Sequence, residues 1–257
     1  MGHERVGVLP KSQQWRAIVH ELASAAESEA ATRRVAVATL ANVKHRFATV
    51  HEDRGVQAAL GYLIGLTAAH LPGSGTDLVP TVDLSENQSA LALGQHLAGW
   101  VQEHAESAEY AALSTRAAAD AIAFWTRQNS RQAQLFATET PTAELWRRAA
   151  TGAAFSELTR TFFAKFTERY LNYFLEREAS AAIPSLRERD VFAARLGHHL
   201  DAVAKHAFET TKIAQGFAAG WYNKNARNER PNGEDVRGFL SFAFGKLRAE
   251  LERERAG

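Results

Sequence analysis

The sequence predicts an all-α fold, a helical bundle of about eight helices with no significant sheet. The chain has 49 Ala and 24 Leu against 14 Val and 5 Ile, which favours residues that lose little entropy in helices over residues that fill strands. Apolar residues recur at spacings of three and four. Prolines are few, and they lie between the periodic runs, where they separate one predicted helix from the next.

Three helices are predicted in the first third of the chain. Pro10 and Ser12 open the first, whose apolar side is Trp15, Ile18, Val19 and Leu22. The second has a narrow apolar seam of Ala36, Leu40, Val43, Phe47 and Val50. The third is the uncharged run Gly55 to Leu71, which a Pro-Gly-Ser-Gly sequence ends. A long loop follows as far as Leu84, and its LVPTV piece is a short strand at most.

The remaining helices are predicted from their start and stop signals. Ser85 opens a capping-box sequence ahead of a helix through Leu93 and Trp100, and another helix begins near Ala108. After Thr140-Pro141 a helix or helix pair extends to about Ala182. The last predicted elements are a helix over 186–222, a turn at NKNARNERPNG and a helix over 234–255. We expect residues 1–257 to form a single all-helical domain, with a subdivision near 135–140 left open.

The run from Gly55 to Leu71 is either a membrane span or the buried centre of the bundle. About 20 apolar residues are needed to cross a bilayer, and this run has seventeen, counting Gln57 and His70. No Lys or Arg flanks its C-terminal side. We therefore predict a helix buried on all sides, with Gly61 and Gly65 allowing another backbone to approach closely. A similar small-residue notch, GFAAG, lies at 216–220 and would be an intramolecular partner across two helices, and self-association through either notch is left open.

Charge is unevenly distributed although the net charge is only +1. Residues 55–115 contain six acids and no Lys or Arg, so this block sums to −6 and the rest of the chain to +7. We expect basic helices elsewhere in the chain to enclose or pair the block, and a cationic partner protein is the alternative. The overall charge does not indicate a nucleic-acid partner.

The segment Phe155 to Phe174 holds seven of the 24 aromatic residues. On a helix, Phe155, Phe162, Phe166 and Tyr170 lie broadly along one side. Two interpretations follow: the central helix of the bundle, or an aromatic-lined pocket or oligomer interface, since aromatic residues dominate interface energetics. The second interpretation makes these four residues candidate binding residues.

Two histidines occupy positions where a helical seam expects Leu. His199 and His206 fall on a 4,3,4,3 pattern that runs from Phe192 to Gly220. Seven residues place them about 10 Å apart along the axis, too far to share one ion. No HxxxH or HExxH sequence and no Cys is present, so we expect no metal site and no cofactor. The two residues are interpreted as partly buried histidines or as candidate binding residues.

Arg46 and His51 form an R-x4-H spacing in the segment KHRFATVHED. This spacing resembles the signature of the all-helical HEPN ribonucleases, in which Arg and His from two subunits converge on a scissile phosphate. The resemblance implies that His51 would act on the attacking or leaving oxygen and that Arg46 would stabilise the phosphate charge without a metal. A solvated helix end is the other interpretation of the same residues.

The sequence favours a non-enzymatic function. We expect a soluble interaction or regulatory accessory protein that binds a protein partner or self-associates. No export or organelle signal is visible at the start of the sequence, so we expect it to be cytoplasmic, with no membrane association. A metal-independent ribonuclease using Arg46 and His51 is one alternative, and a small-molecule sensor built on the aromatic helix is another.

Overall fold

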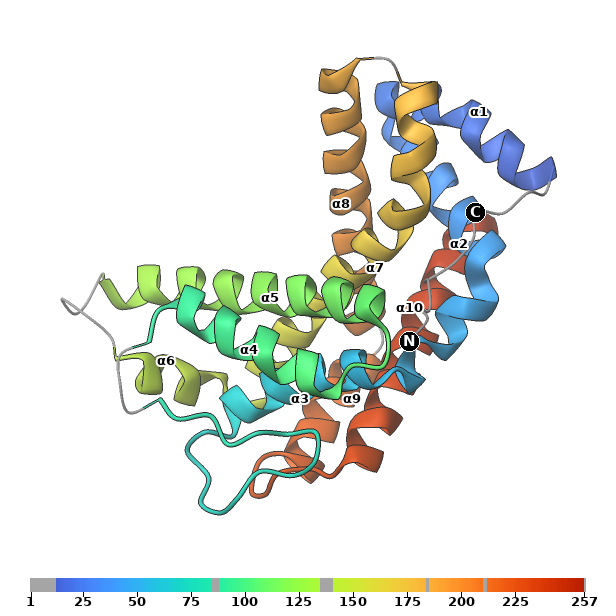
Figure 1. Cartoon of the computed structure of the whole chain (residues 1–257). Helices are drawn as coiled ribbons and strands as arrows, with labels where there is room; N and C mark the ends of the chain where they lie inside the picture. The colour runs from blue at the N-terminus through green and yellow to red at the C-terminus, as the bar shows by residue number, and fades with distance from the viewer. Residues whose placement is uncertain (1–12, 85–87, 135–140, 184, 210–211, 257) are drawn as a thin grey trace.

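A computed structural model describes residues 13–84, 88–134, 141–183, 185–209 and 212–256. These residues form ten α-helices and one short 3-10 helix, with no strand among them (Figure 1). The helices are α1 (Gln13–Glu27), α2 (Glu29–Thr49), α3 (Arg54–Thr67), α4 (Ala90–His104), α5 (Ala108–Gln134), α6 (Thr142–Ala149), α7 (Gly152–Ala182), α8 (Leu186–Glu209), α9 (Lys212–Asn225) and α10 (Gly233–Ala256), and η1 (Val50–Glu52) joins α2 to α3. The predicted all-α class is confirmed.

Short polar side chains begin several of the helices. Ser28 accepts a hydrogen bond from the Ala31 amide at 3.0 Å, and Asp53 accepts one from the Val56 amide at 3.0 Å. α4 begins later than predicted, because its N-cap is Ser89, which accepts from the Ala92 amide at 3.1 Å. Ser85, the predicted cap, lies outside the described residues.

The count rises from about eight predicted helices to ten among the described residues. The segment after Pro141, predicted as a helix or helix pair, is the pair α6 and α7, which Ala150 and Thr151 separate. Of the helix predicted over 186–222, the structure describes α8 up to Glu209 and α9 from Lys212, and residues 210–211 between them lie outside the described residues. α8 packs against α1, α2, α7 and α10, and α9 packs against α7, α8 and α10.

α3 is the buried centre that its uncharged sequence predicts. Every residue from Gly55 to Thr67 is buried, beneath α4, α5, α6, α7 and α10. The helix is shorter than the uncharged run, since it ends at Thr67, and His70 is exposed. No helix among the described residues has the length and apolar character that a membrane crossing requires.

The notch on α3 holds an extended segment of the same chain rather than another helix. We call residues 76–84 the crossing segment. A Cβ atom at Gly61 would overlap the carbonyl oxygen of Leu78 and lie 2.8 Å from its carbonyl carbon, and one at Gly65 would lie 2.7 Å from the Pro80 oxygen. The predicted close approach is therefore present, but its predicted partner is wrong. At the GFAAG notch Gly220 faces open space.

α7 is the central helix of the aromatic core. Phe155, Phe162, Phe166 and Tyr170 are all fully buried. Their rings meet aromatic rings from four other helices: Phe47 of α2, Tyr110 of α5, Trp221 and Tyr222 of α9, and Phe239 and Phe244 of α10. In Figure 1, α7 runs between α5 and α8. Edge-to-face contacts such as that of Phe166 on Phe244 contribute beyond the apolar area that they bury.

The turn between α9 and α10 fixes the end of α3 and the crossing segment. Arg230 donates to the carbonyl oxygens of Ala68 and Leu71 through one terminal nitrogen, at 3.1 and 3.0 Å, and to those of Pro72 and Gly73 through the other. A guanidinium at this place satisfies carbonyls that a helix C-terminus leaves open and complements its dipole.

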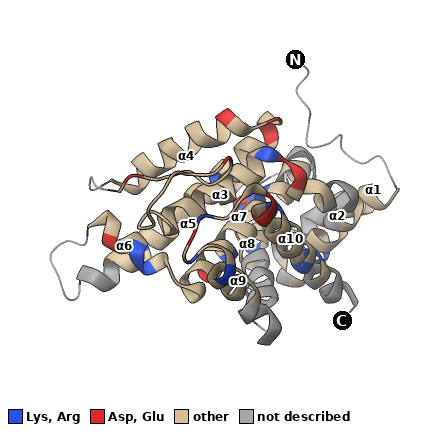
Figure 2. Ribbon diagram, turned by 90° about the horizontal axis from the view of Figure 1, so that it is seen from below, with Lys and Arg blue, Asp and Glu red and all other residues tan. Residues whose placement is uncertain are grey.

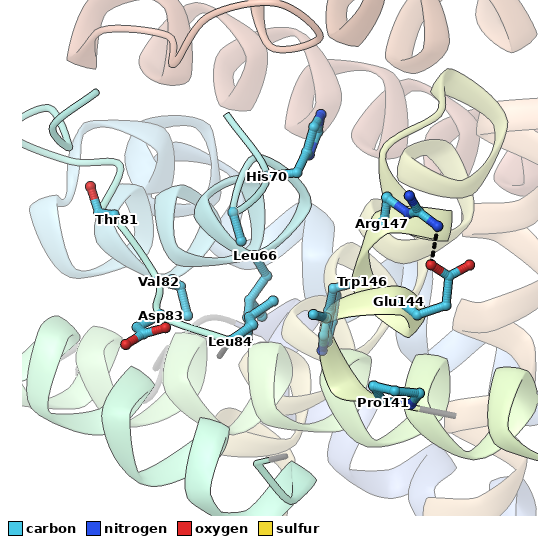
Figure 3. Close-up of a pocket in the computed structure, with 12 residues that line it drawn as sticks. Leu66, His70, Thr81, Val82, Asp83, Leu84, Pro141, Glu144, Trp146 and Arg147 are labelled. Carbon is cyan, nitrogen blue, oxygen red and sulfur yellow. Dashed lines mark hydrogen bonds and ion pairs between the residues drawn. The ribbon is translucent and has the colours of Figure 1, made fainter. Parts of the chain in front are cut away.

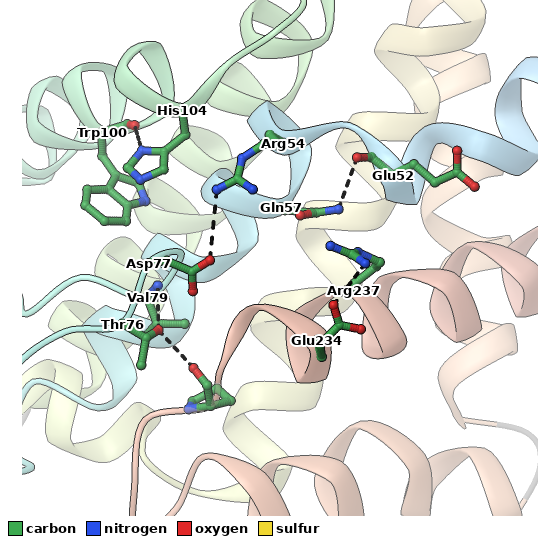
Figure 4. A network of polar contacts seen from close by, with 11 residues as sticks. Glu52, Arg54, Gln57, Thr76, Asp77, Val79, Trp100, His104, Glu234 and Arg237 are labelled. Carbon is green, nitrogen blue, oxygen red and sulfur yellow. Dashed lines mark hydrogen bonds and ion pairs between the residues drawn. The ribbon is translucent and has the colours of Figure 1, made fainter.

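The crossing segment has two further anchors, which Figure 4 shows. The Thr76 hydroxyl donates to the Pro231 carbonyl at 3.0 Å and accepts from the Val79 amide at 3.2 Å. Asp77 lies 3.9 Å from Arg54. The crossing segment is therefore fixed to α3 through Arg54 and to the turn between α9 and α10 through Pro231.

Candidate ligand-binding site

The crossing segment separates two pockets. Thr81, Val82 and Asp83 line both of them. Val82 is buried, whereas Thr81 and Asp83 are exposed, the alternation of an extended chain. One pocket opens toward α6 and the other toward α4, and we name them the α6 pocket and the α4 pocket.

The α6 pocket has a volume of about 760 Å³ and an apolar floor with a charged rim (Figure 3). The charged groups have partners: Arg147 pairs with Glu144 of the same helix, and the His70 Nδ1 lies 3.1 Å from the Thr67 carbonyl oxygen. Its remaining polar feature is the indole N–H of the buried Trp146, which has no hydrogen-bond acceptor in the described part of the chain.

The α4 pocket has a volume of about 430 Å³, within the range of small-molecule sites. One side is the exposed face of α4, where residues three and four apart lie above one another. The other side is Tyr62 of α3 together with the crossing segment. Its lining residues are Tyr62, Pro80, Thr81, Val82, Asp83, Gln88, Gln95, His96, Gly99, Trp100 and Glu103.

Three buried polar atoms in the wall of the α4 pocket have no hydrogen-bond partner among the described residues. They are the Tyr62 hydroxyl, the Trp100 indole N–H and the Gln88 Oε1. Tyr62 is 3% exposed, so its hydroxyl is removed from bulk solvent. A buried polar group without a partner costs free energy. The two pockets differ in this respect, because three lining residues of the α4 pocket have such a group and one lining residue of the α6 pocket, Trp146, has one.

The α4 pocket is acidic. Asp83 and Glu103 belong to the block that lacks Lys and Arg, and both lie in the pocket wall. In Figure 2 acidic residues gather at the end of α4, while α6 carries a basic segment. We expected basic helices to pair this block. Arg54 next to Asp77 is such a pair, although Arg54 directly precedes the block in sequence. Asp83 and Glu103 line the α4 pocket.

The structure places the four aromatic candidates in the core, away from both pockets. Phe155, Phe162, Phe166 and Tyr170 are each 0% exposed, and neither the α4 pocket nor the α6 pocket includes them. Core packing fully accounts for their presence. A ligand site on this helix remains a prediction without a described cavity beside it.

The other candidates lie apart from these pockets. His199 and His206 belong to α8, and Arg46 to α2, but their side chains lie outside the described set. The predicted seam from Phe192 to Gly220 spans α8 and α9. His51 lies in η1 with its Nε2 3.9 Å from Glu52 Oε1. Within the described residues, no three His, Asp or Glu side chains gather as ligands of one metal ion would.

Sequence reasoning did not find the residues of the α4 pocket. Trp100 was expected only as part of the apolar side of its helix, and Tyr62 only as part of a buried run. The available signal was the block at 55–115, which contains six acids and no Lys or Arg and so indicates an acidic surface. No family model, curated protein or solved structure matches this chain. The site is therefore argued from its own geometry.

Replacing Tyr62 by phenylalanine is expected to change stability at high pH and not at neutral pH. Burial raises the pKa of Tyr62 above its ordinary 10.0. Above pH 10 the unfolded chain ionises this phenol and the folded chain does not, so the free energy of unfolding falls as pH rises. Tyr222, whose pKa burial also raises, contributes to the same fall. In Tyr62→Phe the decline should be shallower, as measured by urea unfolding between pH 7 and 11.

At pH 7 the same variant should lie within about 0.5 kcal/mol of the wild type, because the hydroxyl donates to no protein acceptor. A loss above about 1 kcal/mol at pH 7 would show that the hydroxyl has a partner in the folded chain and would contradict its assignment to the pocket.

Proposed function

We propose that this protein is a non-enzymatic small-molecule-binding protein whose ligand occupies the α4 pocket. The observation that carries the proposal is that three lining residues of this one pocket, Tyr62, Gln88 and Trp100, each have a buried polar atom without a hydrogen-bond partner among the described residues. Native proteins hydrogen-bond the large majority of such atoms, and a cluster of exceptions in a concave site is typical of a ligand-binding site. The proposal moves the sensor hypothesis from the aromatic helix to the α4 pocket.

The pocket is built on rigid elements. α3 is wholly buried, and its close contact with the crossing segment leaves no room for a methyl group at Gly61. The side-chain amide of Gln88 donates to the backbone carbonyl of Asp83 at 2.9 Å. The backbone carbonyl of Gln88 accepts from the Thr142 hydroxyl at 2.8 Å, which connects the pocket wall to α6. A site held this way offers its polar atoms in fixed positions, so a ligand loses little free energy in ordering them.

The interaction-protein hypothesis has less support in the geometry. The most exposed large apolar side chains of the described residues are Leu91, Leu186 and Phe242, and they lie on three different helices. Singly scattered apolar residues are ordinary on a protein surface, whereas an interface needs a contiguous patch. A protein partner or self-association therefore stays a prediction, as does ribonuclease activity based on Arg46 and His51.

A cavity-filling substitution tests the proposal. Gly99 lies in the pocket wall, and a Cβ atom there would meet no atom within 4 Å. Leucine at this position should fill part of the pocket without a clash and abolish ligand binding. The measurement is a fragment screen by saturation-transfer NMR, in which wild-type hits are retested on Gly99→Leu.

The same helix offers a matched control. Gly94 also has open space around its Cβ position but does not line the pocket. Gly94→Leu should keep every hit that Gly99→Leu loses, while both variants gain helix propensity of similar size. Hits that survive in both variants would refute the α4 pocket as the ligand site.

A further inference from the structure

Asn232 and Gly233 form the only Asn-Gly sequence of the chain, in the turn between α9 and α10. Asparagine is a thermolabile residue. It reacts most readily when glycine follows, because no side chain then hinders attack by the next backbone nitrogen. Asn232 is exposed, so water and hydroxide reach its side chain. The pair is therefore a candidate site of spontaneous covalent modification.

The packing of the crossing segment requires glycine at position 233. A Cβ atom there would lie 3.1 Å from the Asp77 carboxylate and 3.2 Å from the Leu78 Cδ1, which leaves little room for a side chain. Asp77 and Leu78 both belong to the crossing segment. The residue that this contact favours is also the one that leaves the Asn232 side chain most open to attack, so the tertiary structure itself maintains the reactive pair.

The side chain of Asn232 caps α10. Its Oδ1 accepts from the Asp235 amide at 3.0 Å, and the Asp235 Oδ2 accepts from the Asn232 amide at 3.3 Å. An N–H group that donates to Oδ1 stabilises the negative charge that this oxygen gains when a nucleophile attacks Cγ. Gly233 is the first residue of α10, a position where the backbone N–H has no intrahelical acceptor. The cap therefore activates Cγ and leaves the attacking nitrogen outside the hydrogen bonds of the helix.

We propose that Asn232 is a deamidation site in the folded protein, with water as the co-reactant. The Gly233 nitrogen gives its proton to hydroxide and attacks the Asn232 Cγ. The N–Cγ bond forms and the Cγ–Nδ2 bond breaks, so that the amide nitrogen leaves as ammonia with a proton from water. Water then opens the resulting succinimide ring at either carbonyl, which gives aspartate or isoaspartate. No atom is oxidised or reduced.

The two products differ in their effect on the turn. Aspartate keeps the course of the backbone and an acceptor oxygen at the cap. Isoaspartate leads the main chain through the side-chain carbons, so the oxygen that accepted from the Asp235 amide becomes a peptide oxygen and the cap is lost. Pro231, directly before it, accepts from the Thr76 hydroxyl at 3.0 Å (Figure 4). Isoaspartate should therefore loosen both the first turn of α10 and an anchor of the crossing segment.

Peptide mapping by mass spectrometry, on protein kept folded at mildly alkaline pH, tests the site. The peptide that contains Asn232 should gain the mass shift from amide to acid, and it should do so faster than at mildly acidic pH. Asn129, which Ser130 follows within α5, is the internal control. Its Nδ2 donates to the Trp125 carbonyl at 2.9 Å, and its peptide should stay unchanged. An unchanged Asn232 peptide, or equal conversion of both peptides, would overturn the proposal.

Two variants separate the reaction from its consequence. Asn232→Ser keeps a capping hydroxyl and removes the amide, so it should fold and show no mass shift in this turn. An intact-protein mass shift that persists at the same rate in Asn232→Ser would show that another residue reacts and would overturn the proposal.

Asn232→Asp is the matched control for the added charge, and it should melt with the wild type, because aspartate also caps helices. The isoaspartate form, separated from fresh protein by anion exchange, should have a Tm about 2 to 4 °C lower. Equal melting of the isoaspartate form and Asn232→Asp would contradict the role of this residue in the turn. The reaction needs no ligand, so these outcomes are independent of the proposed function.

Discussion

Replacing Gly61 by alanine is expected to lower the free energy of unfolding by about 3 kcal/mol or more. The added methyl group would overlap the carbonyl oxygen of Leu78. Hydrogen bonds fix the backbone around that oxygen. The Thr76 hydroxyl donates to the Pro231 carbonyl and accepts from the Val79 amide, and Arg230 donates to the nearby Pro72 carbonyl. Because α3 is buried on all sides, it has no free direction in which to move. Urea unfolding followed by circular dichroism measures the effect.

The control for this substitution is Gly94→Ala, at a half-buried position of α4. The same chemical change there meets no atom within 4 Å and should raise the free energy of unfolding by about 0.5 to 1 kcal/mol, the gain in helix propensity. Opposite signs for the two glycines are the expected result. A stabilised Gly61→Ala would show that the crossing segment does not lie against α3 as described.

Replacing Arg230 by methionine is expected to cost about 2 kcal/mol of folding free energy. The substitution keeps most of the aliphatic stem and removes the donors to four carbonyl oxygens at the end of α3. Arg230→Lys should recover less than half of the loss, because a single ammonium group cannot reproduce the two-pronged geometry of the guanidinium.

Arg237→Met is the control for the loss of a surface arginine. Its guanidinium lies 3.0 Å from Glu234 one turn away, and both side chains are exposed, so solvent screens the pair. Its effect should stay within about 0.5 kcal/mol. If Arg230→Met costs no more than this control, the guanidinium does not stabilise the end of α3.

The parts of the fold that the sequence predicted are those that depend on local pattern. The uncharged run at Gly55–Leu71 predicted a buried helix, and the composition predicted the all-α class. The elements that α8 and α9 pack against depend instead on the tertiary fold, which periodicity alone does not contain. The notch at Gly61 correctly indicated a close backbone contact, but the identity of the contacting backbone depends on the whole topology.

The candidate site could not be predicted for a related reason. A tyrosine in an apolar run is expected to be buried, and the sequence does not say whether its hydroxyl finds an acceptor. For Tyr62 the answer depends on the crossing segment and α4, which reach the residue through tertiary structure. The acidic character of the pocket, by contrast, was visible as the absence of Lys and Arg over 55–115.

The hydrogen bonds that Arg230 donates at the end of α3 join residues separated by 157 to 162 positions in the sequence. During translation, the helix and the chain that crosses it leave the ribosome long before the arginine that holds them together. The cavity beside them can therefore reach its final shape only after residue 230 has left the ribosome. The proposed ligand recognition consequently requires the turn between α9 and α10, and a nascent chain that lacks this turn cannot acquire it.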